Sequence, residues 1–197
     1  MVIDIGTGDG RFVYRSARRN PEQFFIGIDA NIGPLAKISE KIYRRTDKGG
    51  APNALFLQAA IEGLPDELSK IADKVHIQFP WGSLLQAVAS GDALILKSLR
   101  RLCRKEARLE VLISFDPTRD GSELDRLGLP ELSREYLEQK LVAAYEANGF
   151  VIEDYGVLPS PEWPEIESSW AKKLRHSGTR VLIYLRAVSD GRFVSQT

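Results

Sequence analysis

The sequence predicts an α/β fold in which a mostly parallel, Rossmann-like sheet of seven strands ends in an antiparallel pair. Three observations favour this class. Short apolar runs bounded by turn residues alternate with segments of helical periodicity, which is typical of strands covered by helices on both faces. The first run passes directly into a glycine-rich loop. It contains Asp4, and the second run ends in Asp29. The alternation then breaks, and the last two runs are typical of an antiparallel pair at a sheet edge.

Each strand of the parallel part is a short apolar run between turn residues. In chain order these runs are Val2–Ile5, Phe24–Asp29, Ala54–Gln58, Val75–Phe79 and Leu109–Phe115. The segments between them carry apolar residues at helical spacing. This spacing predicts helices near Arg11–Arg19, Pro34–Arg45, Pro65–Ile71 and Ala93–Lys105.

The C-terminal part begins with a predicted helix near Ser133–Asn148, which Gly149 ends. Strands are expected at Phe150–Leu158 and Arg180–Val188. The connection between them, from Pro159 to Thr179, holds two of the three tryptophans. Long connections inside compact domains are often functional, so this one is a candidate for part of the site.

The composition is that of one domain covering residues 1–197. Lys plus Arg and Asp plus Glu both number 27, so a nucleic-acid partner would have to be recognised by local charge clusters. A single cysteine, Cys103, excludes an internal disulfide, and we expect it to be a structural residue in a helix. No apolar stretch approaches ~18 residues and the start lacks a signal-peptide pattern, which predicts a cytoplasmic protein, expected to be a monomer.

The first strand and its loop indicate a cofactor site. In Asp4-Ile5-Gly6-Thr7-Gly8-Asp9-Gly10, the glycines let the backbone approach a ligand closely, and the next helix points its amides toward it. Asp29 ends the second strand at about the 20-residue interval where a nucleoside-binding carboxylate usually lies. A nucleoside-containing cofactor is therefore predicted. A dinucleotide dehydrogenase is the main alternative, but its fingerprint spaces the last two glycines by three.

Two further segments narrow the class of enzyme that the cofactor site could serve. They are Gln78-Phe79-Pro80-Trp81-Gly82-Ser83 and Ser168-Ser169-Trp170-Ala171-Lys172-Lys173-Leu174. With Asp4–Arg11, Gly27–Asp29 and Ala59–Pro65, they resemble the 16S rRNA (adenine-1408 N1)-methyltransferases, which confer kanamycin and apramycin resistance. The resemblance covers nearly the whole chain. It implies the class I methyltransferase fold and methyl transfer from S-adenosylmethionine to N1 of adenine 1408 in 16S rRNA of the small ribosomal subunit. Family members usually carry a segment before the first strand, which we expect to be missing here.

The resemblance also implies a cofactor-binding set. Asp4 would receive the ammonium group of S-adenosylmethionine, and Asp29 would accept hydrogen bonds from its ribose hydroxyls. Ile61 and Glu62 would hold the adenine of the cofactor. The remaining members of the set are Gly6, Thr7, Gly8, Gln78, Phe79 and Ser83.

Trp81 and Trp170 are the predicted contacts of the target base. Adenine N1 lies on the Watson–Crick edge, so the base must leave its stack before a methyl donor can reach it. Two indole faces could hold the extruded purine and stabilise the cationic product. Pro80 would offer a carbonyl to the adenine amino group, and Ser168 a short polar contact. Packing in the core is the alternative role for both tryptophans.

Basic residues form two predicted rRNA-binding clusters. The first follows the second strand at helical spacing and consists of Lys37, Lys41, Arg44, Arg45 and Lys48. The second surrounds Trp170 and consists of Lys172, Lys173, Arg175 and Arg180. Phosphate contacts of this kind position an enzyme without specifying sequence. A solvated helix face remains the alternative for any single lysine.

Several features carry weaker expectations. Trp163 is expected to be a packing anchor, and the basic run from Lys97 to Lys105 the solvated side of an amphipathic helix. His76 and His176 are isolated, so no metal site is expected. Two other functions stay open: another RNA methyltransferase, such as a tRNA guanine-N7 enzyme, or a binding module that holds the cofactor without transfer.

Overall fold

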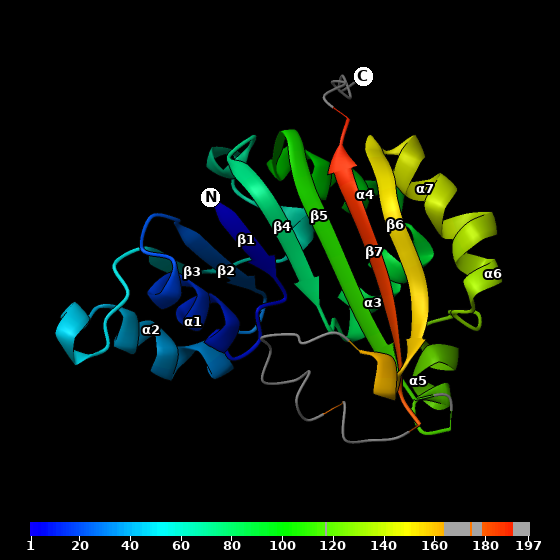
Figure 1. The fold of residues 1–197 in the computed structure, drawn as a ribbon, viewed down its shortest axis with the longest axis horizontal. Helices are drawn as coiled ribbons and strands as arrows, with labels where there is room; N and C mark the ends of the chain where they lie inside the picture. The colour runs from blue at the N-terminus through cyan, green and yellow to red at the C-terminus, as the bar shows by residue number, and fades with distance from the viewer. Residues whose placement is uncertain (117, 164–173, 175–178, 191–197) are drawn as a thin grey trace.

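The computed structural model describes residues 1–116, 118–163, 174 and 179–190. In this part the chain forms one seven-stranded sheet with the order β3-β2-β1-β4-β5-β7-β6 (Figure 1). The strands are β1 Val2–Ile5, β2 Phe25–Asp29, β3 Ala54–Gln58, β4 Ala72–Gln78, β5 Cys103–Phe115, β6 Phe150–Pro159 and β7 Val181–Ser189. The first five are parallel, whereas β7 is antiparallel to both β5 and β6. The predicted fold class is confirmed.

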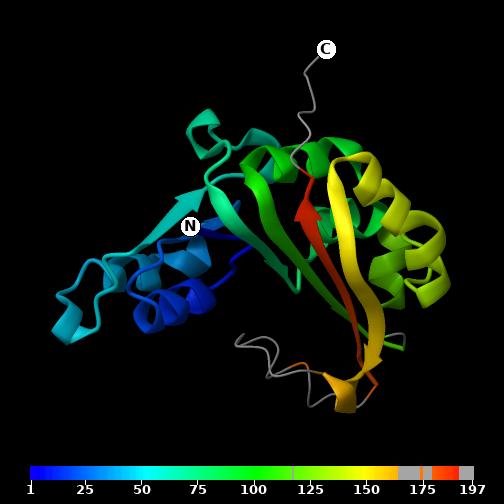
Figure 2. The ribbon, with the colours of Figure 1, turned by 45° about the horizontal axis from the view of Figure 1, so that its top comes forward.

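Helices cover the two faces of the sheet unequally. Figures 1 and 2 show α1 and α2 on one face beside β1–β3, whereas α3 and α4 lie behind the other face and α6 and α7 run beside β6. The helices are α1 Arg11–Arg19, α2 Ala36–Ile42, α3 Gly82–Ser90, α4 Ala93–Leu102, α5 Gly121–Arg126, α6 Arg134–Tyr136 and α7 Val142–Ala147. A π-helical segment, Leu137–Leu141, joins α6 to α7, so the predicted C-terminal helix is continuous with one widened turn. None of the helices in the described ranges has the length and apolar character needed to cross a membrane.

Two hydrophobic cores hold the helices on the sheet. The larger one lies under α3, α4 and α7, where Leu96, Leu99 and Tyr145 are fully buried. The Tyr145 hydroxyl donates to the Val88 carbonyl at 3.1 Å, so burying this phenol leaves no unpaired donor. The smaller core lies between α1 and the β2–β3 edge and is centred on Val13.

Several elements differ from the sequence prediction: β4 and β5 begin before the predicted starts at Val75 and Leu109, and α3 and α5 have no predicted counterpart. The helix predicted to reach Lys105 ends at Leu102, and Cys103 opens β5 rather than lying in a helix. The helix predicted at Pro65–Ile71 is only a 3-10 turn, Asp66–Leu68. It cannot continue because Lys70 has a left-handed φ of 58° and donates its amide to the Arg101 carbonyl.

Two cations of the basic run on α4 and β5, Arg101 and Arg104, make contacts within the protein, so the run is not only the solvated side of a helix. Arg101 pairs with Asp66 and donates to the Leu64 carbonyl at 2.7 Å. Arg104 donates to Asp73 at 2.9 Å and to the Lys70 carbonyl at 3.4 Å. Arg101 thus ties α4 to the β3–β4 connection, and Arg104 ties the start of β5 to the start of β4, so both serve the fold.

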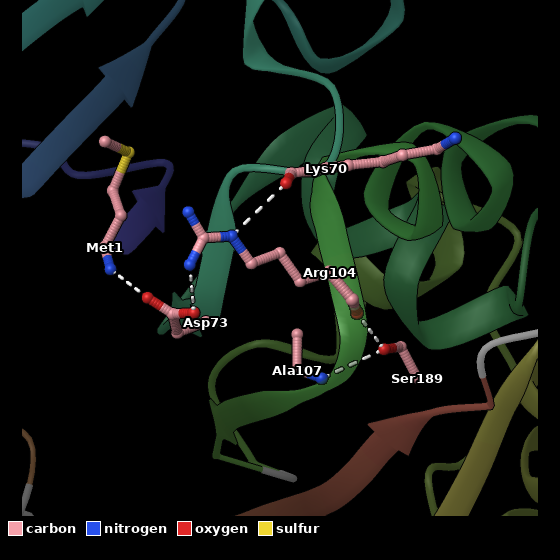
Figure 3. A network of polar contacts seen from close by, with 6 residues as sticks. All are labelled: Met1, Lys70, Asp73, Arg104, Ala107 and Ser189. Atoms are coloured by element: carbon pink, nitrogen blue, oxygen red, sulfur yellow. Dashed lines mark hydrogen bonds and ion pairs between the residues drawn. The ribbon is translucent and has the colours of Figure 1, made fainter.

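Figure 3 shows how this network continues to β7 through Ser189. The Ser189 hydroxyl donates to the Arg104 carbonyl and accepts from the Ala107 amide at 3.0 Å. It bridges the irregular stretch of β5 around Glu106, which has a φ of 62°. The buried side chain thus replaces ladder hydrogen bonds that the irregularity removes.

We predict that Ser189→Ala lowers the free energy of unfolding by about 1–3 kcal/mol, because it leaves a buried amide and carbonyl unpaired. Thermal unfolding would detect this as a lower Tm, at roughly 2–4 °C per kcal/mol for a chain of this size. Ser122→Ala, on the exposed side of α5, is the matched control. Equal Tm values for the two variants would contradict the bridging role.

Candidate active site

A cavity of about 490 Å³ opens at the carboxyl ends of β1, β2, β3 and β4. This is where ligands bind in open α/β sheets, beside the point at which the strand order reverses. The cavity is lined by every residue of the predicted cofactor set: Asp4, Gly6, Thr7, Gly8, Asp29, Ile61, Glu62, Gln78, Phe79 and Ser83. Pro80 and Trp81 also line it.

The glycine loop is held open by a carboxylate from the neighbouring strand. The two Asp29 oxygens accept hydrogen bonds from the amides of Gly8 and Asn31, both at 2.8 Å. Gly8 has a φ of 59°, which favours glycine, and a Cβ added there would meet no atom within 4 Å. By contrast, a Cβ at Gly10 would lie 2.7 Å from the Phe56 ring. The loop is therefore packed at Gly10 and open at Gly8, which lines the cavity.

Asp4 is a buried acid on the cavity wall, only 3% exposed. Burial raises its pKa to about 7, the Asp29 charge adds to the rise, and the neighbouring Thr7 hydroxyl opposes it. No ion pair reaches Asp4 from the residues that the structure describes. A ligand that brings a positive charge would favour the ionised form of this carboxyl.

Polar side chains continue from Asp4 across the sheet in register. Asp4 aligns with His76, His76 with Glu110, and Glu110 with Arg186. His76 Nδ1 lies 3.2 Å from Glu110 Oε2, and Arg186 Nε donates to Glu110 Oε1 at 3.2 Å. The bond from His76 is the main cause that lowers the pKa of Glu110 to about 2, whereas burial lowers the pKa of His76. His76 is thus neutral near pH 7 and offers Asp4 no compensating charge.

Unpartnered oxygens mark further places for a ligand. Gln78 Oε1 is buried at the cavity without a hydrogen-bond partner among the described residues, and the Thr7 hydroxyl beside Asp4 accepts no hydrogen bond from any of them. Buried polar atoms of this kind are normally satisfied. An open glycine backbone, an unpaired acid and these acceptors together fit a ligand that carries an amino group and hydroxyls.

The wall formed by Phe79, Pro80 and Trp81 joins the cavity to the surface. Pro80 is buried, whereas Trp81 is 56% exposed at the start of α3. Trp81 therefore does not take the alternative role of a core residue. The predicted residues Trp170, Ser168, Lys172, Lys173 and Arg175 lie outside the described residues.

Some residues of the two predicted basic clusters already have partners within the protein, and others are exposed. Lys41 lies over the Tyr14 ring at 4.5 Å, and Arg45 donates to Asp47 at 3.1 Å. Lys37, Arg44 and Lys48 are exposed. Arg180 is mostly buried and donates to Asp120 at 2.9 Å, so a phosphate would have to share this guanidinium with a carboxylate.

Sequence reasoning missed several lining residues. These are Ile5, Asp9, Phe12, Ile28, Ala30, Asn31, Ala59, Ala60 and Leu84. Most of them directly follow a strand or open a helix, a signal that would have found Asn31 and Ala59. Phe12 and Leu84 reach the cavity from the first turns of α1 and α3, which only the packing of those helices decides.

The chain matches known proteins over most of its length. Residues 1–189 match the family described as NpmA: 16S rRNA (adenine(1408)-N(1))-methyltransferase. A 16S rRNA (adenine(1408)-N(1))-methyltransferase of Escherichia coli is 40% identical over 173 residues, 87% of this chain and 79% of the relative.

Solved structures agree with this match. A crystal structure of the aminoglycoside resistance methyltransferase NpmB1 is 44% identical, covers 95% of this chain and 86% of its own, and has a TM-score of 0.83. A mutant of the 16S rRNA (adenine(1408)-N(1))-methyltransferase from Catenulisporales acidiphilia, with cosubstrate SAM, is 32% identical. It covers 100% of this chain and 88% of its own, with a TM-score of 0.85.

The burial of Asp4 makes a prediction about stability. Its pKa rises from 3.8 to about 7 on folding, so the folded protein holds a proton that the unfolded chain releases between those values. Stability contributed by this group is therefore present below about pH 4 and lost as the pH rises toward 7. We expect Asp4→Asn, which cannot ionise, to gain about 2–3 kcal/mol relative to the parent between pH 5 and pH 8, because the two pH units from 5 to the folded pKa of about 7 correspond to roughly 2.7 kcal/mol.

Differential scanning calorimetry at the two pH values, without ligand, measures this gain. The control is Asp125→Asn on the exposed face of α5. A Tm difference between Asp4→Asn and the parent that is the same at pH 5 and pH 8 would show that Asp4 does not titrate in this range.

Proposed function

The chain belongs to the 16S rRNA (adenine(1408)-N(1))-methyltransferase family, and on that premise we propose that it methylates N1 of adenine 1408 in 16S rRNA of the small ribosomal subunit. The methyl donor is S-adenosylmethionine, and the modification gives resistance to aminoglycosides. The observation that carries the proposal is the cavity in which an unpaired buried acid, a clamped glycine loop and an exposed tryptophan meet.

The residues on the strand side of the cavity suit the donor. Asp4 would hold its ammonium group, which restores the charge that burial disfavours. Asp29 would accept from the ribose hydroxyls. A carboxylate has about four lone-pair positions, so its two backbone amides leave capacity for two further donors. Ile61 is buried and apolar while Glu62 is exposed, which suits the face and the polar edge of an adenine.

The residues at the surface side suit the acceptor base. When bound, S-adenosylmethionine supplies a methyl group activated by a positively charged sulfur. Adenine N1 has its own lone pair, so the protein needs to orient the base rather than remove a proton from N1. Trp81 would stack on the flipped adenine, with Trp170 on the opposite face, and the Pro80 carbonyl would accept from the amino group. Aromatic faces would also stabilise the cationic product.

Recognition of the ribosome would use the first basic cluster, Lys37, Lys41, Arg44, Arg45 and Lys48, together with Lys172, Lys173, Arg175 and Arg180. These cations would contact phosphates and set the register of the enzyme on its substrate. The balanced total charge favours recognition of a shaped rRNA surface over nonspecific attraction.

A labelling experiment tests the proposal. Purified 30S subunits are incubated with the protein and radiolabelled S-adenosylmethionine, and the modified position is mapped by reverse transcription. We expect label in 16S rRNA and a stop at adenine 1408, because N1 methylation blocks base pairing. Label in tRNA and none in 16S rRNA would favour the guanine-N7 alternative instead. Cofactor binding without label in either RNA would indicate a binding module.

We predict that Trp81→Ala lowers the rate of transfer to 30S subunits by about 5- to 150-fold, the range that corresponds to losing one stacking contact of roughly 1–3 kcal/mol. Isothermal titration should show a cofactor Kd within about threefold of the parent, since the side chain lies at the rim. Trp81→Phe, which keeps an aromatic face, is the control and should retain most activity. Equal rates for the alanine variant and the parent would contradict the stacking role.

A further inference from the structure

Trp163 fastens the segment that leaves β6 to the wall of the cavity. Its side chain is 3% exposed, and its indole nitrogen donates to the Leu158 carbonyl at 3.2 Å. Its ring stacks on Phe79 with centroids 6.2 Å apart and planes 17° from parallel. Figure 1 shows this segment beside the carboxyl end of β5, where β7 begins. A residue from the β6–β7 connection therefore contacts a cavity residue that follows β4.

Phe79 is a residue that needs such support. Its φ is 54°, a left-handed conformation that is unusual for a bulky side chain and costs on the order of 1–3 kcal/mol. Its amide donates to the Leu112 carbonyl at 2.7 Å, which fixes the backbone on one side. This turn aims the chain from the end of β4 toward Pro80 and Trp81, so the direction of the base-binding wall depends on it.

The cluster around this stack is separate from the two cores that hold the helices. It consists of the buried residues Leu112, Trp163 and Leu182, with Phe79, Leu158, Leu174 and Tyr184 packed against them. Leu174 belongs to the same connection as Trp163. Two residues of the connection, Trp163 and Leu174, therefore pack in the cluster that contains Phe79. The cluster links the connection to the cavity wall.

We propose that Trp163 is a positioning residue for methyl transfer: its indole holds Phe79 in the left-handed turn and so sets the wall from Phe79 to Trp81. The expected effect of Trp163 on methyl transfer rests on the function proposed above. The expected effect on cofactor affinity does not depend on methyl transfer, because Phe79 lines the cavity.

The test compares Trp163→Leu, which removes the stacked ring, with Trp163→Phe, which keeps one aromatic ring and removes the indole hydrogen bond together with the second fused ring. We expect Trp163→Leu to lower kcat on 30S subunits at least tenfold and to raise the cofactor Kd about fivefold. Trp163→Phe should stay within about threefold of the parent in both. Leu102→Ala, in the larger core, controls for a loss of stability without a change at Phe79.

The outcomes separate positioning from packing. If Trp163→Leu and Leu102→Ala lose kcat and cofactor affinity only in proportion to their unfolded fractions, Trp163 is a packing residue and the proposal is wrong. If the unmodified protein labels no 16S rRNA, the proposed function is wrong. The role of Trp163 is then decided by the cofactor Kd values of the two Trp163 variants alone. Should Trp163→Leu not fold, Trp163→Met replaces it, because it also removes the stacked ring, fills more of the buried space and leaves the cavity residue Phe79 unchanged; the same losses are expected.

Discussion

The carboxylate of Asp29 is the constraint on which the site depends. It accepts the amides of Gly8 and Asn31 at once, so it joins the loop after β1 to the loop after β2. Without that clamp, the three left-handed glycines at every second position, Gly6, Gly8 and Gly10, would give the first loop much backbone freedom. The same oxygens are the proposed ribose acceptors. One group therefore shapes the cavity before a ligand arrives and binds the ligand afterwards, which reduces the entropic cost of binding.

The site is made from groups that destabilise the folded chain. Asp4 is a buried carboxyl with a raised pKa, Gln78 presents an unpaired buried oxygen, and Phe79 adopts a left-handed turn. The amino end of the sheet is the opposite case, because Arg101 and Arg104 there pair with acids and carbonyls. Unfavourable groups thus gather at the carboxyl edge, and the compensating contacts lie where no ligand is expected.

The sequence predicts the local part of this arrangement well and the non-local part poorly. The bounds of β1 and α1 are those predicted, because glycines and an apolar run mark them clearly. The change from α4 to β5 at Cys103 has no glycine or proline to mark it, and α3 begins at Gly82 after Trp81, an N-cap residue whose side chain makes no cap hydrogen bond. The lining residues that follow strand ends could be predicted, whereas Phe12 and Leu84, which reach the cavity from α1 and α3, could not. The stack of Trp163 on Phe79 joins residues 84 positions apart, and no pattern in one sequence specifies it.

Charge pairing is a way for a protein with no net charge to present the selective basic surface that we propose for rRNA. Arg45 is engaged with Asp47, Arg180 with Asp120, and Lys41 with the Tyr14 ring. The two acid pairs weaken the pull of Arg45 and Arg180 on distant phosphates, because the opposite charges largely cancel at distances well beyond their separation. Salt screens what remains beyond about a Debye length. A surface of this kind attracts RNA weakly in general and binds where phosphates match the fixed cations. For an enzyme that must find one adenine on a folded ribosomal subunit, matching by position is more useful than a strong uniform field.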